Sequence, residues 1–350
     1  MSQELTNIHW QVAVHTMRGA SHLRSELPNQ DAIQASRLPD GLPPIVLAVA
    51  DGHGSLKSFR SDCGSQFAVE VAVEVCRKFL DDNFRETSVI KQRAEQQIPR
   101  DIFRRWYQRV DKHHARYPFT EEELEGQANS LGKIESDGVA SDQQIRLAYG
   151  TTLLAVLVER DFAIYFQLGD GEILEVSEAG EVTHAIPRDE SLIANETSSL
   201  CQEEVLKDFR CRIRFFQNSP PAIILLTTDG YPNSFASFPE FLKAGTDYLR
   251  MFQKDGFDSV NQSIPGWLEE ASREGSGDDI TLGLLVRAEP RLPVRTVTAP
   301  PDAQGDTQGA DAIASIDNPP SEPVTNNPSD VAADRDSVSP QNSNTGEFAP

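Results

Sequence analysis

The sequence predicts an α+β fold, a layered sandwich in which paired sheets carry helices on their faces. Eight short apolar or alternating runs, mostly bounded by Gly, Asp or Pro, are typical of strands. Longer helix-like segments lie between these runs, as expected of helical crossovers between sheet segments. An apolar fraction of 38% in 350 residues is enough for one main core.

The expected strands follow one another along most of the chain. They cover residues 10–15, 45–50, 151–158, 162–168, 173–176, 211–216, 222–227 and 281–286. The first expected helix carries four apolar residues at four-residue steps, which places on one face Phe67, Val71, Val75 and Phe79. The expected helices are residues 65–80, 87–116 and 238–252.

The chain is expected to form one domain and a tail. The domain covers residues 1–290 and contains a charged helical and loop insertion at about 84–145, in which Pro99 interrupts or starts a helix. After this domain the composition changes to Pro, Ser, Asn, Asp, Gln and Ala, with almost no aromatic residues. Such a segment buries too little apolar area to offset its ordering entropy, so residues 291–350 are predicted to be a disordered, acidic tail.

Charge and cysteine content exclude several function classes. The chain has 32 Lys and Arg against 54 Asp and Glu, and its net charge of −22 repels nucleic acid and anionic lipid. The four cysteines form no C-x-x-C pair and lack the dense spacing of a secreted disulfide framework. No signal-peptide pattern is present, and no run reaches the roughly 18 to 20 apolar residues of a membrane span. We therefore expect a cytoplasmic protein that binds neither nucleic acid nor membrane.

Four segments place an aspartate at a predicted strand end, followed closely by Gly or another acid. They are LAVADGHG at 47–54, YFQLGDGE at 165–172, ILLTTDGY at 224–231 and EGSGDDIT at 274–281. Each motif alone is typical of a turn. Together they bring carboxylates to sheet edges, where the carboxylates repel one another unless a cation joins them. Hard divalent ions prefer oxygen ligands, and the scarcity of His and Cys nearby favours Mg²⁺ or Mn²⁺ over zinc.

Six motifs resemble, in the same order, those of the type 2C, or PPM, family of metal-dependent serine/threonine protein phosphatases, and look most like a divergent bacterial branch. They are NQDA at 29–32, ADGHG at 50–54, YGTTLLAVLV at 149–158, LGDGE at 168–172, TTDG at 227–230 and GDDIT at 277–281. The resemblance covers about residues 10–288. It implies a four-layer α-β-β-α sandwich of two mainly antiparallel sheets flanked by helices.

The resemblance also implies the metal ligands. Asp51 resembles the carboxylate that bridges two ions, while Asp229 and Asp278 resemble the other carboxylate ligands of the first ion. The backbone carbonyl of Gly52 resembles a ligand of the second ion, and Asp31 resembles an acid that holds the waters of that ion.

Three further residues complete the implied site. Asp170 resembles a ligand of a weaker third ion, His53 resembles a general acid for the leaving alcohol, and Asp279 is kept as a reserve ligand. The implied cofactors are two Mg²⁺ or Mn²⁺ ions, with a third in addition. The implied reaction is hydrolysis of phosphoserine or phosphothreonine by a hydroxide that bridges two ions. A phosphorylated protein substrate and a cognate serine/threonine kinase are the implied partners of a monomeric enzyme.

The sequence departs from the family where an arginine holds the substrate phosphate. Glu26 occupies that position, four residues before Gln30. Arg24 or His22 is the expected replacement, because a cationic side chain on this segment would face the same rim. Lys57 and Arg60, which follow the DGHG turn, are second choices.

Two other functions remain open at this point. A non-catalytic module of the same fold would bind a phosphoprotein or a metal ion through a degraded site, although the main aspartates are intact. A small-molecule phosphatase would share the metal ions and differ in the rim of the site.

Overall fold

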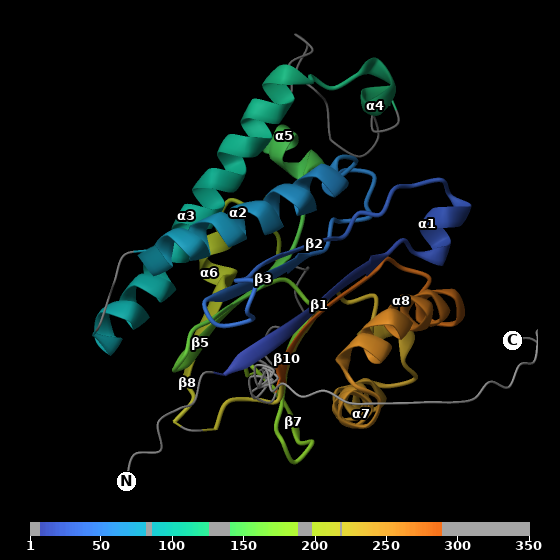
Figure 1. Ribbon diagram of the computed structural model, residues 1–350. Helices are drawn as coiled ribbons and strands as arrows, with labels where there is room; N and C mark the ends of the chain where they lie inside the picture. Colours follow the sequence, from blue (N-terminus) through green and yellow to red (C-terminus); the bar gives the residue numbers. More distant parts are fainter. Residues whose placement is uncertain (1–7, 82–85, 126–140, 188–197, 218, 289–350) are drawn as a thin grey trace, which may run out of the picture. The chain divides into compact units, whose positions relative to one another are not determined.

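The computed structural model describes residues 8–81, 86–125, 141–187, 198–217 and 219–288 (Figure 1). Ten strands in these residues form two five-stranded sheets in which all pairs are antiparallel. The predicted α+β sandwich of two antiparallel sheets flanked by helices is confirmed. The tail predicted at 291–350 and part of the predicted insertion lie outside the described residues.

The two sheets have simple strand orders. The first contains, in order, β1 (His9–Met17), β10 (Ile280–Ala288), β9 (Ile223–Thr227), β6 (Glu172–Val176) and β7 (Val182–His184). The second contains, in order, β2 (Ala32–Ser36), β3 (Ile45–Ala50), β4 (Leu153–Val158), β5 (Phe162–Leu168) and β8 (Arg210–Phe215). The sequence did not predict the short strands β2 and β7.

Strand β3 shows how the layers pack. All six of its residues are buried, because successive side chains point to opposite faces of a sheet that is covered on both sides. Ile45, Leu47 and Val49 belong to the apolar cluster between the two sheets. Val46 and Ala48 belong to the cluster under the helices.

Helices on the outer face of the second sheet form one outer layer (Figure 1). The main ones are α2 (Ser61–Asp81), α3 (Thr87–Arg116) and α5 (Asp142–Ala148). The short α4 (Glu121–Glu125) follows α3 in the chain, and Val205 of the short α6 (Val205–Asp208) belongs to the same apolar cluster. Helix α3 is continuous through Pro99, so the prediction that this proline interrupts or starts a helix is wrong. The reason is a buried stripe at four-residue steps on both sides of it, formed by Ile90, Ala94, Ile98, Ile102, Trp106 and Val110.

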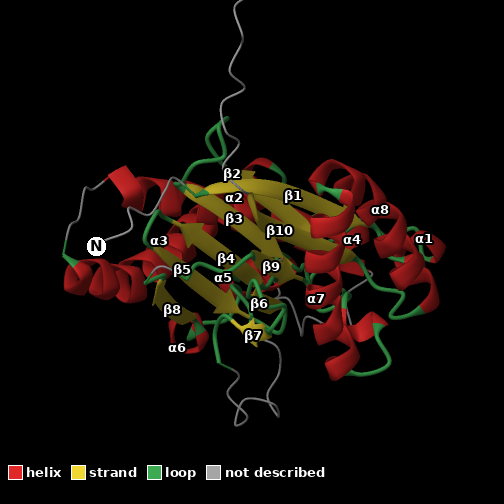
Figure 2. Cartoon of the chain, turned by 60° about the horizontal axis from the view of Figure 1, so that its bottom comes forward, coloured by secondary structure: helices red, strands yellow, loops and turns green. Residues whose placement is uncertain are grey.

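The other outer layer covers the first sheet and contains α7 (Phe238–Asp255) and α8 (Phe257–Glu274). Figure 2 shows these two helices on the side of the strands away from α3. The sequence did not predict α8, which contains Pro265 followed by a glycine. Its buried residues nevertheless repeat every four positions, at Val260, Ile264 and Leu268. No helix among the described residues is both long and apolar enough to cross a membrane.

Antiparallel pairing decides which chain segments meet at the site. The last residue of β3, Ala50, pairs with the first residue of β2, Ala32, so Asp51 and Asp31 leave the sheet at the same end. Likewise Thr227, at the end of β9, pairs with Leu282 near the start of β10. One edge of the sandwich therefore collects the aspartates that follow β3 and β9 and those that precede β2 and β10.

Candidate active site

A cleft with a volume of about 710 Å³ opens at this edge. Four aspartates line it, each from a different loop: Asp51, Asp170, Asp229 and Asp278. The other lining residues are His53, Gly54, Ser55, Leu56, Lys57 and Thr152. The structure thus brings one aspartate from each of the four sequence motifs to a single cavity.

The backbone of Asp51 is held by the turn that leads into β4. Its N–H donates a 3.0 Å hydrogen bond to the Thr152 hydroxyl. Its carbonyl accepts 2.8 Å bonds from the Thr151 hydroxyl and from the Thr152 N–H. Three hydrogen bonds therefore orient the residue before its carboxylate reaches the cleft.

The carboxylate of Asp51 lies in an unfavourable electrostatic environment. Burial raises the pKa of Asp51 well above its usual range, and the charges of three neighbouring aspartates raise it further. The neighbouring Asp229 side chain also contributes to the raised pKa of Asp51. The Asp229 carboxylate also accepts a 3.0 Å bond from the Asn233 amide. Burial and the charges of Asp170 and Asp278 raise the pKa of Asp229.

Asp31 is buried behind the cleft and does not line it. Its carboxylate accepts a 2.8 Å hydrogen bond from the Thr228 hydroxyl, which links the end of β9 in one sheet to the start of β2 in the other. Burial raises the pKa of Asp31 well above its usual range, and the charges of Asp279 and Asp278 act in the same direction.

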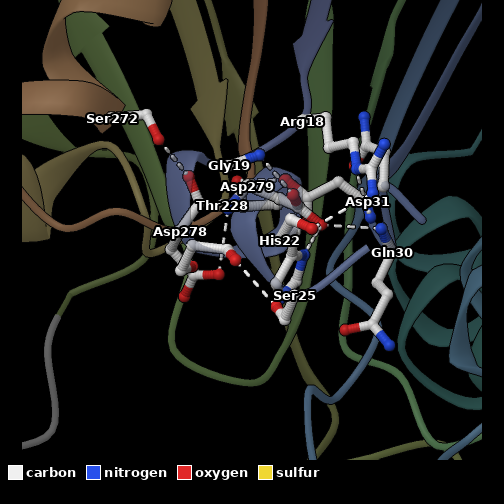
Figure 3. Close-up of polar contacts among 12 residues, drawn as sticks. Arg18, Gly19, His22, Ser25, Gln30, Asp31, Thr228, Ser272, Asp278 and Asp279 are labelled. Carbon is white, nitrogen blue, oxygen red and sulfur yellow. Dashed lines mark hydrogen bonds and ion pairs between the residues drawn. The ribbon is translucent and has the colours of Figure 1, made fainter. Parts of the chain in front are cut away.

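Asp278 is held at the cleft by the end of helix α8. Its carbonyl accepts a 2.8 Å bond from the Ser272 hydroxyl, and its carboxylate accepts a 2.9 Å bond from the Asp279 N–H (Figure 3). Burial raises the pKa of Asp278, and the charges of Asp279 and Asp170 add to this effect.

The donor set of the cleft fits divalent cations. Carboxylates that raise one another's pKa are stabilised in their ionised form by a cation between them. Within the part of the chain that the structure describes, no three His, Cys, Asp or Glu side chains by themselves enclose a metal position. Mg²⁺ usually keeps several water ligands and takes only one or two carboxylates, so an open cluster of this kind suits it.

Gly52 sits where no side chain fits. A Cβ atom at this position would lie 2.5 Å from the Gln30 carbonyl oxygen and 2.7 Å from the Ser61 carbonyl oxygen. The Gly52 N–H donates a 3.1 Å bond to the same Gln30 carbonyl. The close approach of three backbone segments thus explains the glycine after Asp51.

His53 lines the cleft beside the backbone of Gly150, whose carbonyl accepts a 3.1 Å bond from the His53 N–H. Burial lowers the pKa of His53, and the negative charge of Asp170 opposes this change. A lowered pKa works against a general acid, because less of the imidazole carries a proton at neutral pH. Asp170 therefore favours the role that the family resemblance implies for His53.

Asp279, the reserve ligand, points away from the cleft. Its carboxylate accepts hydrogen bonds from the backbone N–H groups of Gly19 at 2.6 Å and Gln30 at 2.7 Å (Figure 3). The Nδ1 atom of His22 lies 2.9 Å from the same carboxylate. Protein groups thus surround both carboxylate oxygens, and this anchoring role is one that the sequence did not reveal. Asp278 and Asp279 are adjacent acids, so their residue types alone do not indicate which of the two faces the cleft.

The two residues expected to anchor phosphate do not line the cleft. His22 is buried against Asp279, and Arg24 is exposed on α1 (Ala20–Arg24). The geometry therefore does not support either as the anchor. Of the second choices, Lys57 lines the cleft and Arg60 does not.

The sequence of this chain was compared with models of known protein families. Residues 18–269 match the protein phosphatase 2C family. The chain belongs to this family. Members of the family depend on Mg²⁺ or Mn²⁺. A comparison with curated proteins gives no significant match.

Several solved structures have a similar fold. A bacterial serine phosphatase is 17% identical, with 81% of this chain and 100% of that chain covered and a TM-score of 0.51. The serine/threonine phosphatase Stp1 from Staphylococcus aureus is 15% identical, with 82% and 99% covered and a TM-score of 0.50. These likenesses support the family fold.

Proposed function

We propose that this protein is a metal-dependent protein phosphatase that hydrolyses phosphoserine and phosphothreonine. One observation carries the proposal: four aspartates from separate loops line a single open cleft. Burial and the charges of neighbouring aspartates raise the pKa of three of them, Asp51, Asp229 and Asp278. Membership of the protein phosphatase 2C family supports the same activity. An open cleft of about 710 Å³ leaves room for a phosphorylated side chain with part of its peptide.

The proposed cofactors are two Mg²⁺ or Mn²⁺ ions, with a weaker third one near Asp170. Asp51 would hold both main ions, with Asp229, Asp278 and the Gly52 carbonyl as further ligands. When bound, the ions supply a water of lowered pKa for the attack and neutralise the charge on the phosphoryl oxygens. Asp31, behind the cleft, would fix bound waters, in keeping with its place next to Thr228.

The protein's own groups would complete the reaction around the phosphoryl group. His53 lines the cleft and would give a proton to the departing serine or threonine oxygen. The charge of Asp170 would offset part of the effect of burial, which lowers the pKa of this imidazole. The proposed partners are a phosphorylated protein and its serine/threonine kinase, and the proposed setting is a monomer in the cytoplasm.

The test is hydrolysis of a phosphothreonine peptide with and without Mn²⁺, with a small phosphate ester as second substrate and EDTA as control. Turnover of the peptide that requires Mn²⁺ and stops with EDTA is the expected result. Turnover of the small ester alone would point to a small-molecule phosphatase. Peptide binding without turnover of either substrate would point to a non-catalytic module.

A further inference from the structure

The cleft is lined by four aspartates and is strongly acidic. If the four lining aspartates and Asp31 are ionised, they carry five negative charges. The two main divalent ions would neutralise four of these charges, so without the weaker third ion the site keeps one negative charge before a phosphate dianion enters. A positive side chain at the rim would therefore favour phosphate binding.

Lys57 is the one Lys or Arg among the described residues that line the cleft. Its side chain is exposed, and it follows Asp51 by six residues in the same loop. Glu26 stands where the family resemblance implies an arginine, and this exposed residue does not line the cleft. The charge that would bind a phosphate is thus provided from a different loop.

The other basic candidates are held elsewhere. The Arg60 guanidinium donates two 2.7 Å bonds to Glu123 and further bonds to the carbonyl of Tyr117 and to the hydroxyl of Tyr149. This network ties Arg60 to α4 and to the turn before β4. His22 lies against Asp279, as described above.

A tight turn presents Lys57 to the cleft. The Ser58 N–H donates a 2.9 Å bond to the Ser55 carbonyl, which closes a β-turn with Leu56 and Lys57 at its centre. The Ser58 hydroxyl donates a 2.9 Å bond to the Leu147 carbonyl, so the turn is anchored to the end of α5. The exposed side chains at the tip are therefore carried by an anchored backbone.

We propose that Lys57 binds the phosphoryl group of the substrate and replaces the arginine that this chain lacks at Glu26. The inference rests on the proposed phosphatase function, because it assigns the group that holds the phosphate of that reaction. The Lys57 ammonium would contact phosphoryl oxygens that the metal ions leave free. Arg24 is the rival anchor.

The test uses the Mn²⁺-loaded protein with the variants Lys57→Met, Lys57→Arg and Arg24→Met. Lys254→Met, at the exposed end of α7, is the control for loss of one positive charge. Lys57→Met is expected to lower kcat/KM for a phosphothreonine peptide roughly 5- to 20-fold, the effect of a charge-assisted hydrogen bond reduced by solvent exposure. Lys57→Arg should keep most activity, and inhibition by inorganic phosphate should weaken in parallel in Lys57→Met. The Mn²⁺ concentration for half-maximal activity should not change.

Three results would overturn the assignment. Wild-type kinetics in Lys57→Met would exclude a phosphate contact, and the same loss in Arg24→Met alone would assign the anchor to Arg24. A higher Mn²⁺ requirement in Lys57→Met would show that the lysine acts through the metal ions.

A separate measurement distinguishes failure of the proposed function from failure of the anchor. If the wild-type protein shows no turnover, calorimetric binding of inorganic phosphate to the Mn²⁺-loaded protein replaces the kinetic assay. Weaker binding in Lys57→Met would then support the anchor without the enzyme activity. Equal binding, or no binding in either protein, would overturn it.

Discussion

The carboxylate of Asp279 accepts a 2.7 Å hydrogen bond from the backbone N–H of Gln30. This bond joins the start of β10 in one sheet to the residue before Asp31, at the start of β2 in the other. Asp279 follows Asp278 directly, so one buried carboxylate relates the positions of two predicted site acids to each other.

Replacing Asp279 should therefore destabilise the fold. Asp279→Ala leaves the N–H groups of Gly19 and Gln30 buried without their acceptor, and the free energy of unfolding should fall by about 2–4 kcal/mol. Asp279→Asn should cost less, because the amide oxygen still accepts one of the two bonds. Urea unfolding measures both, with the exposed Asp255→Ala as control at about 0.5 kcal/mol or less. A loss in Asp279→Ala no larger than in this control would contradict the anchoring role.

Catalysis should depend on the cleft aspartates. Asp51→Asn and Asp229→Asn each remove a charge that would hold a metal ion, and each should lower kcat with Mn²⁺ roughly 100-fold or more. The exposed Asp258→Asn, on α8, should keep wild-type activity. Circular dichroism checks that the folds are intact. Near-normal rates in both cleft variants would remove them from the mechanism.

Without metal, ionisation of the buried Asp51 carboxyl should destabilise the folded protein as the pH rises. Its pKa is raised in the folded state, so Asp51 is protonated in both states below the ordinary Asp pKa of about 3.9 and has no effect there. Above that pH, ionisation is easier in the unfolded chain, so the folded state loses stability. In EDTA, Asp51→Asn should therefore melt at a higher Tm than wild type, by a margin that grows from pH 4 to pH 7.

With Mn²⁺ bound, the wild-type protein should melt at a higher Tm than Asp51→Asn. Mn²⁺ binds the folded wild-type site and should raise its Tm, whereas Asp51→Asn should gain much less. Thermal melting at pH 7 with and without Mn²⁺ measures both effects. If the Tm difference between wild type and Asp51→Asn in EDTA does not change with pH, ionisation of Asp51 does not destabilise the folded protein.

Glu26 carries a backbone conformation that favours glycine. Its φ of 58° lies in the left-handed region, directly after the end of α1. The Leu27 N–H donates a 3.0 Å bond to the His22 carbonyl, a helix-ending arrangement whose left-handed position is usually glycine. Glu26→Gly should therefore raise the free energy of unfolding by about 0.5–1 kcal/mol.

A matched control separates this effect from the general cost of glycine. Glu270→Gly, on the exposed face of α8, should lower the free energy of unfolding by about 1 kcal/mol. Chemical denaturation compares the two variants under the same conditions. If Glu26→Gly and Glu270→Gly lower the free energy of unfolding by similar amounts, the left-handed backbone conformation at Glu26 does not destabilise the protein.

The sequence alone predicted a layered α+β sandwich and all four acids that line the cleft. Strands and helices follow from local periodicity. The ordered motifs that contain Asp51, Asp170, Asp229 and Asp278 indicated a metal site, because each aspartate lies next to an expected strand. Helix α8 and strand β2 escaped prediction. A Pro-Gly pair interrupts the helical pattern of α8, and β2, with the sequence AIQAS, is mostly half-buried and lacks a continuous apolar run.

Only the tertiary structure decided the roles of neighbouring residues in the loops. Asp278 and Asp279 have the same chemistry and adjacent positions, yet one faces the cleft and the other binds two backbone N–H groups from the N-terminal segment. Lys57 reaches the cleft, whereas Arg24 does not. The physical reason is that strand periodicity depends on near neighbours in the chain. The direction of a loop side chain depends on hydrogen bonds and packing with segments that are distant in sequence.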